Sequence, residues 1–149
     1  MAYLSSFDIA ASGMSAQRLR MDIAAENIAN IDTTRTEAGG PYRRKVVQLE
    51  SYGAGSFRDA LRSASRGAGF SGRSAGVRVA GILEDDREMK RVYNPGHPDA
   101  DAEGYVNYPN VDLLKETVDS MSATRSYEAN VTALNAMKLM AQKALDIGK

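Results

Sequence analysis

Small and apolar residues recur every seven positions near the start of the chain. Two such lines run three positions apart: Phe7, Met14, Met21 and Ile28, each followed by Ala10, Gln17, Ala24 and Ile31. This is the spacing of a coiled-coil seam, and it predicts a helix from Ser5 to about Asn30, roughly 39 Å long at 1.5 Å per residue. We expect Ser5 to cap this helix, with Asp8 in its first turn.

A further apolar line on the same segment consists of Ile9, Ala16 and Ile23. It lies about 160° from the first line at 100° per residue, so one partner helix cannot cover both. Gly13 stands among small residues between the two lines. It indicates either the close approach of another backbone or local flexibility.

The C-terminal segment predicts a second helix, because residues 111–147 contain no glycine or proline. Asn110 is the expected N-cap and Gly148 the expected terminator, which gives a helix of roughly 55 Å. Three lines follow its heptads: Leu113, Tyr127, Leu134 and Ala141; Ala123, Asn130, Met137 and Ala144; and Ala133, Met140 and Ile147. The polar seam members Gln17 and Asn130 are of the kind that fixes the register of a coiled coil.

The segment between the helices predicts a small β-rich insert. Strands are expected at 42–49, 76–83 and 88–93, where β-branched residues partly alternate with polar ones. Residues 53–76 are rich in Gly, Ser and Arg and indicate a mobile basic loop. The fold class is therefore mainly α with a β-rich insert: an N-terminal helix region (1–31), the insert (32–110) and a C-terminal helix region (111–149). The two helices are expected to pack as a coiled-coil-like hairpin.

Composition and charge argue against several classes of function. The 149 residues include 19 basic and 19 acidic side chains and no cysteine, which removes a global attraction to nucleic acid and all thiol chemistry. The lone histidine, His97, has Asp99 and Asp101 nearby but no second nitrogen ligand for a metal. No phosphate-binding loop or catalytic triad is present. No Sec signal or membrane-spanning stretch is found, so composition alone suggests a cytoplasmic protein.

The arginines of the 53–76 loop leave one nucleic-acid alternative open. Arg58, Arg62 and Arg66 are spaced by four, and only Phe57 and Phe70 are available there for base stacking. A solvated linker explains the same residues, and salt-dependent DNA binding by the purified protein would distinguish the two.

Particular stretches resemble the flagellar axial proteins, the family of rod, hook and hook-associated subunits. Residues 11–17 (Ala-Ser-Gly-Met-Ser-Ala-Gln) and 27–30 (Asn-Ile-Ala-Asn) resemble its N-terminal signature, and residues 121–130 are similar to its C-terminal helix. Within the family, the proximal rod proteins are matched by residues 32–36, 39–44, 94–101, 104–106 and 109–112. The 53–76 loop looks longer and more basic than the family pattern.

The resemblance implies a non-catalytic structural subunit of the flagellar basal-body rod, without cofactor or metal. It implies export by the flagellar type III apparatus and assembly in the periplasm, which replaces the cytoplasmic interpretation. The implied partners are other copies, proximal and distal rod subunits, the export-gate or MS-ring adaptor and the surrounding rings, but not nucleic acid. The alternative is a rod or needle component of a related type III secretion system; residues 39–44 and 104–106 favour the flagellum.

The apolar lines predict where assembly would occur, since a monomer leaves some of them uncovered. Periodicity alone favours a self-contained helical hairpin. The signature residues of the axial family reverse this preference and favour assembly. The expected assembly interface consists of Phe7, Ala10, Met14, Gln17, Met21, Ala24, Asn27, Ile28, Leu113, Met121, Tyr127, Asn130, Leu134, Met137, Met140 and Ala141.

Overall fold

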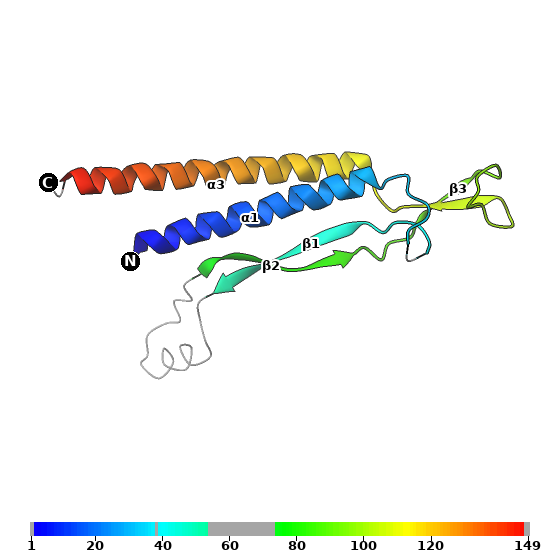
Figure 1. Cartoon of the computed structure of the whole chain (residues 1–149), viewed down its shortest axis with the longest axis horizontal. Helices are drawn as coiled ribbons and strands as arrows, with labels where there is room; N and C mark the ends of the chain where they lie inside the picture. The colour runs from blue at the N-terminus through cyan, green and yellow to red at the C-terminus, as the bar shows by residue number, and fades with distance from the viewer. Residues whose placement is uncertain (1, 38, 54–73, 148–149) are drawn as a thin grey trace, which may run out of the picture.

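Two long helices and two small sheets make up the computed structural model, which describes residues 2–37, 39–53 and 74–147 (Figure 1). The elements in chain order are α1 (Ala2–Ala29), β1 (Lys45–Gly53), β2 (Ser74–Glu84), β3 (Lys90–Tyr93), β4 (Tyr105–Tyr108) and α3 (Leu113–Ile147). The prediction of a mainly helical chain with a β-rich insert is confirmed.

The two helices lie side by side and run antiparallel (Figure 1). The Thr124 hydroxyl lies 3.3 Å from the sulfur of Met21, and Asn27 is hydrogen-bonded to Glu116. These pairs place the end of α1 opposite the start of α3. Since α3 has 35 residues and α1 has 28, the last turns of α3 extend past the first turn of α1.

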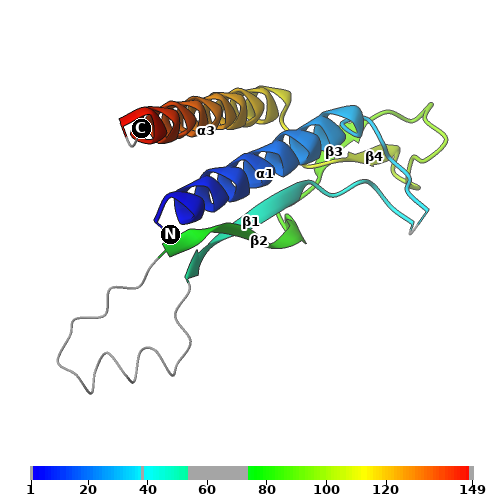
Figure 2. The ribbon, with the colours of Figure 1, turned by 60° about the vertical axis from the view of Figure 1, so that its left-hand side comes forward.

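An antiparallel hairpin of β1 and β2 packs against the other flank of α1 (Figure 2). Its register pairs Val47 with Ile82 and Glu50 with Arg78, with an irregularity after Gln48. Ala16 and Ile23 of α1 are buried. The apolar line of Ile9, Ala16 and Ile23 is therefore mostly covered by the chain's own hairpin and needs no neighbouring subunit there.

The second sheet pairs β3 with β4 and adjoins the start of α3. The Tyr93 and Tyr105 rings meet edge to face at 5.3 Å on its surface. The Lys90 ammonium donates a hydrogen bond of 2.6 Å to the carbonyl of Val111, which is fully buried. This contact attaches the sheet to the segment that leads into α3.

The structure corrects both predicted helix caps. Helix α1 begins at Ala2, so Ser5 and Asp8 lie inside it. At α3 the cap is Asp112, whose carboxylate accepts a hydrogen bond of 3.0 Å from the Leu114 amide. Asn110 instead bonds to other segments through its side chain.

The strand boundaries also differ from the sequence prediction. Strand β1 begins at Lys45 rather than Tyr42 and continues to Gly53, while β2 begins at Ser74. Gly53 and residues 74–76 of the expected loop are therefore strand. The remainder of that loop, 54–73, and the expected terminator Gly148 lie outside the described residues. No strand was predicted at 105–108, yet all four residues of β4 pair with β3.

Candidate functional site

The seam between α1 and α3 uses most of the residues expected at an assembly interface. On α1 the buried or half-buried members are Phe7, Ala10, Met14, Gln17, Met21, Ala24, Asn27 and Ile28. On α3 a line with alternating spacings of four and three is buried or half-buried, namely Glu116, Ser120, Ala123, Tyr127, Asn130, Leu134, Met137 and Ala141. These side chains are thus committed to packing within one chain.

Gly13 explains how closely the helices approach. A Cβ atom built on Gly13 would lie 3.0 Å from the amide nitrogen of Asn130, closer than ordinary packing permits. Helix α1 continues through this position without a break. Of the two interpretations of Gly13, the structure favours close approach.

The remaining expected residues, Leu113, Met121 and Met140, are more than half exposed. Leu113 belongs to a seam heptad, but α1 ends at Ala29 and does not reach it. Met121 joins Leu114 and Val118 on the side of α3 roughly 180° from the seam, and we call these three residues the outer patch.

Met140 belongs to a second exposed group, with Leu139 and Leu145, which we call the free end of α3. These three residues point to different sides of the helix at 100° per residue. Leu145 lies on the seam side of α3 but beyond the first turn of α1, so α1 does not cover it. The last turns of α3 are therefore apolar on several sides and largely uncovered.

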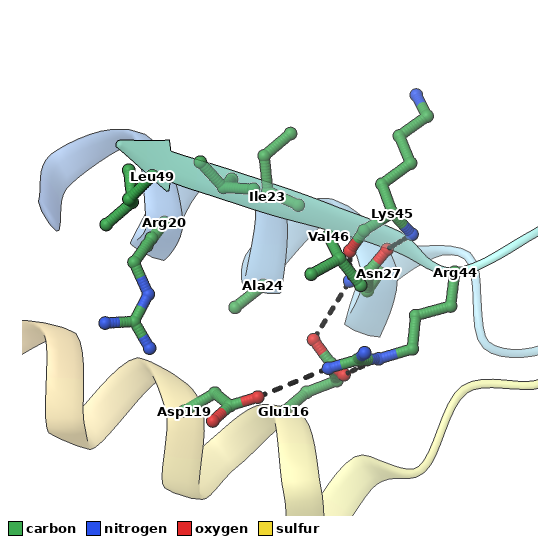
Figure 3. A pocket seen from close by; sticks show the side chains of 11 residues that line it. Arg20, Ile23, Ala24, Asn27, Arg44, Lys45, Val46, Leu49, Glu116 and Asp119 are labelled. Carbon is green, nitrogen blue, oxygen red and sulfur yellow. Dashed lines mark hydrogen bonds and ion pairs between the residues drawn. The ribbon is translucent and has the colours of Figure 1, made fainter. Parts of the chain in front are cut away.

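A buried hydrogen-bond network joins the two helices to β1, and we call Asn27, Tyr42, Arg44 and Glu116 the polar clamp. Figure 3 shows its members Asn27, Arg44 and Glu116. Asn27 is 1% exposed and makes four hydrogen bonds of 2.9 Å. Its oxygen accepts from the Tyr42 hydroxyl and the Lys45 amide, and its nitrogen donates to the Lys45 carbonyl and the Glu116 carboxylate. These bonds use the full capacity of the side chain.

Glu116 carries the buried charge of the clamp and is 2% exposed. Its second carboxylate oxygen accepts a 2.6 Å hydrogen bond from Nε of Arg44 (Figure 3). The Arg44 guanidinium also pairs with Asp119 at 3.2 Å and Asp85 at 3.6 Å. A buried carboxylate is tolerated when it is paired and hydrogen-bonded in this way.

The clamp connects segments that are far apart in sequence. Burial, and then the nearby carboxylates of Glu26 and Glu116, raise the pKa of Tyr42 to about 12, so its hydroxyl remains a donor. The amide of Arg44 donates 2.9 Å to the Asn110 side chain, which itself donates to the carbonyls of Asp85 and Arg87. One end of the molecule is therefore held by side-chain bonds between α1, β1 and the start of α3.

Sequence reasoning found only part of the clamp. Asn27 was among the expected interface residues and lies in the signature at 27–30, whereas Glu116 was not among the expected residues. Arg44 is 72 residues from Glu116, so no local pattern links them.

The described residues contain no group of three or more acidic, His or Cys side chains placed to hold a metal ion. His97 lies in a turn and accepts a 3.1 Å hydrogen bond from the Asp99 amide. No helix in the described part of the chain has both the length and the apolarity needed to cross a bilayer.

Comparison with known proteins matches both helices to flagellar rod families. A family described as flagella basal body rod protein matches residues 7–35, and the flagellar basal body rod FlgEFG protein C-terminal family matches residues 102–147. Both matched segments include parts of the clamp region.

Full-length relatives agree with these matches. The flagellar basal-body rod protein FlgC of Bacillus subtilis is 54% identical over 153 residues, and the alignment covers all of both chains. FlgC of Escherichia coli O6:H1 is 44% identical over all of both chains. FlgC of Borreliella burgdorferi is 43% identical, over 99% of this chain and 98% of that protein. The chain therefore belongs to the FlgC family of flagellar basal-body rod proteins.

Proposed function

We propose that this structural subunit of the flagellar basal-body rod joins its neighbours through the outer patch and the free end of α3. The observation that carries this proposal is the exposure of large apolar side chains there, up to 74% at Leu114 and Leu145. Burying such a side chain stabilises a complex by about 1.5 to 3 kcal/mol when the burial is complete. In an assembled rod, neighbouring subunits can cover these faces.

The free end supports contacts on more than one side. A helix that is apolar all round is normally buried, yet Leu139, Met140 and Leu145 are each more than half exposed. Contacts between unlike patches are heterologous, and they generate an open helical array unless the rotation closes a ring. A rod is the expected product.

The expected interface residues therefore divide into two groups. The seam residues hold α1 against α3 and act on assembly indirectly, by keeping the pair intact. The outward residues, Met121 and Met140 among them, contact neighbours directly. We propose this division in place of one continuous interface.

The family resemblance supports a proposal for where the subunit lies. We propose that it lies in the proximal rod, in the periplasmic part of the basal body, after export by the flagellar type III apparatus. Its neighbours would be proximal and distal rod subunits and further copies of itself. Further contacts would be made with the MS-ring adaptor and the surrounding rings. Its role is to transmit torque without catalysis.

Aspartate substitutions test the outer patch and the free end separately. Val118→Asp and Leu139→Asp each place a charge on a surface that we propose to be buried in the rod, so both are expected to abolish motility in a deletion strain. The isolated variants should keep parental helicity, because both side chains are exposed in the monomer.

Thr132→Asp is the matched control. Thr132 is exposed and lies on the same side of α3 as the outer patch, but in the polar stretch between it and the free end. It is expected to preserve motility. Normal swimming by both Val118→Asp and Leu139→Asp would contradict the proposed contacts.

A further inference from the structure

The apolar members of the helix seam specify its register weakly. Its members include small residues such as Ala10, Ala24 and Ala123, and methionines that adapt to many shapes. They recur with the heptad, so a slip of seven residues places side chains of the same kinds opposite one another. The apolar pattern alone therefore permits more than one alignment of α3 on α1.

Glu116 is different, because its buried carboxylate is satisfied in one alignment only. Its two oxygens accept hydrogen bonds from Asn27 on α1 and from Arg44, the residue that precedes β1. A slip of α3 by one turn moves the carboxylate about 5 Å along the axis, away from both donors. The result is a buried charge without a partner, which is strongly unfavourable.

The same clamp also fixes the hairpin. Asn27 bonds to both the amide and the carbonyl of Lys45, as a neighbouring strand would, and so sets where β1 begins along α1. Arg44, the residue before β1, then pairs with Glu116 on α3. The clamp therefore connects α1, β1 and α3 at one place.

We propose that Asn27, Arg44 and Glu116 form a register lock, positioning residues that select one alignment of α3 on α1. The lock sets where the outer patch and the free end lie relative to the rest of the subunit. Its effect on rod assembly rests on the proposed function. Buried polar groups that fix register at a cost in stability are well known in coiled coils.

Distance measurement between spin labels tests the lock in the purified full-length chain. The sequence has no cysteine, so Ala25→Cys and Ala136→Cys introduce two unique labelling sites at exposed positions. Ala25 lies opposite the beginning of α3, and Ala136 is about 17 residues further along, or roughly 26 Å along the axis. A change of register therefore alters the label distance directly.

The informative variant replaces the charged pair by apolar side chains of similar size, Arg44→Met with Glu116→Leu. It leaves no buried charge, so the helices should still pair, but the alignment is no longer unique. We expect a second distance population shifted by up to about 10 Å, the length of one heptad. Glu116→Gln keeps the volume, removes the charge and should show the same population at a lower fraction.

Asp119→Asn is the matched control, since Asp119 pairs with the same Arg44 but is half exposed. The control should keep the single parental distance. A single parental distance in both Glu116 variants, or a split distribution in the Asp119 control, would overturn the proposal. Because the labels report on the isolated chain, the result is independent of whether α3 contacts neighbours in the rod.

Discussion

Gly76 holds the β1–β2 hairpin against α1, and its replacement gives a sharp test of that packing. Its φ is +127°, a conformation that side-chain-bearing residues rarely adopt, and a Cβ atom there would lie 2.3 Å from the hydroxyl oxygen of Ser12. That hydroxyl donates 2.7 Å to the Ile9 carbonyl and accepts 3.1 Å from the Val77 amide. The contact therefore joins β2 to α1 through one small side chain.

Gly76→Ala should destabilise the protein by about 2 to 4 kcal/mol. Backbone strain at a positive φ costs about 1 to 3 kcal/mol, and displacing Ser12 from its bond to Val77 costs about 1 kcal/mol. For a chain of this length, each kcal/mol lowers the melting temperature by about 3 °C. The expected decrease is roughly 6 to 12 °C.

Thermal unfolding followed by circular dichroism measures this decrease, and Gly81→Ala is the matched control. Gly81 lies on the same strand without a positive φ and with open space around its Cα, so its variant should melt near the parent. Adding Ser12→Ala to Gly76→Ala should recover part of the loss by removing the clash. Equal melting temperatures for Gly76→Ala and Gly81→Ala would refute the reasoning.

Two further predictions concern the start of α3 and the loop before β3. Asp112→Ala removes the N-cap and should cost about 1 kcal/mol in urea unfolding; no loss would reject Asp112 as the cap. Hydrogen bonds from Arg87 lower the pKa of Asp85 from 3.8 to about 2, so its ionised form stabilises the fold above pH 3.8 and this contribution is lost as the pH falls to about 2. Asp85→Asn should therefore be less stable than the parent at pH 6 and equal to it at pH 2; a deficit unchanged across this range would contradict the assignment.

The sequence predicts the helices well because their signal is local and repeated. Heptads on both terminal segments identify two long helices, and Gly13 marks a point of close approach. What periodicity cannot show is which surface covers each line. The line through Ala16 and Ile23 is apolar because the hairpin of the same chain packs on it, whereas the apolar side chains of the outer patch and the free end remain more than half exposed.

The errors at the caps and strands have tertiary causes. Asn110 and Asp112 are both good capping residues, and the choice between them depends on Asn110 being taken up by bonds to Arg44, Asp85 and Arg87. Strand β4 is only four residues long and carries a weak local pattern; it forms because β3 pairs with it. The clamp depends on Arg44, Asn27 and Glu116 meeting across long stretches of chain, so no local pattern reveals it.

Site-specific photo-crosslinking in assembling cells tests most directly whether α3 joins this subunit to the rod. A photoreactive residue at Val118 samples the outer patch, one at Leu139 samples the free end, and one at the exposed Thr132, in the polar stretch between them, is the control. We expect Val118 and Leu139 to form crosslinks to rod subunits in isolated basal bodies, and Thr132 to form few or none. Intermolecular crosslinks absent from both Val118 and Leu139 in assembled basal bodies would contradict the account.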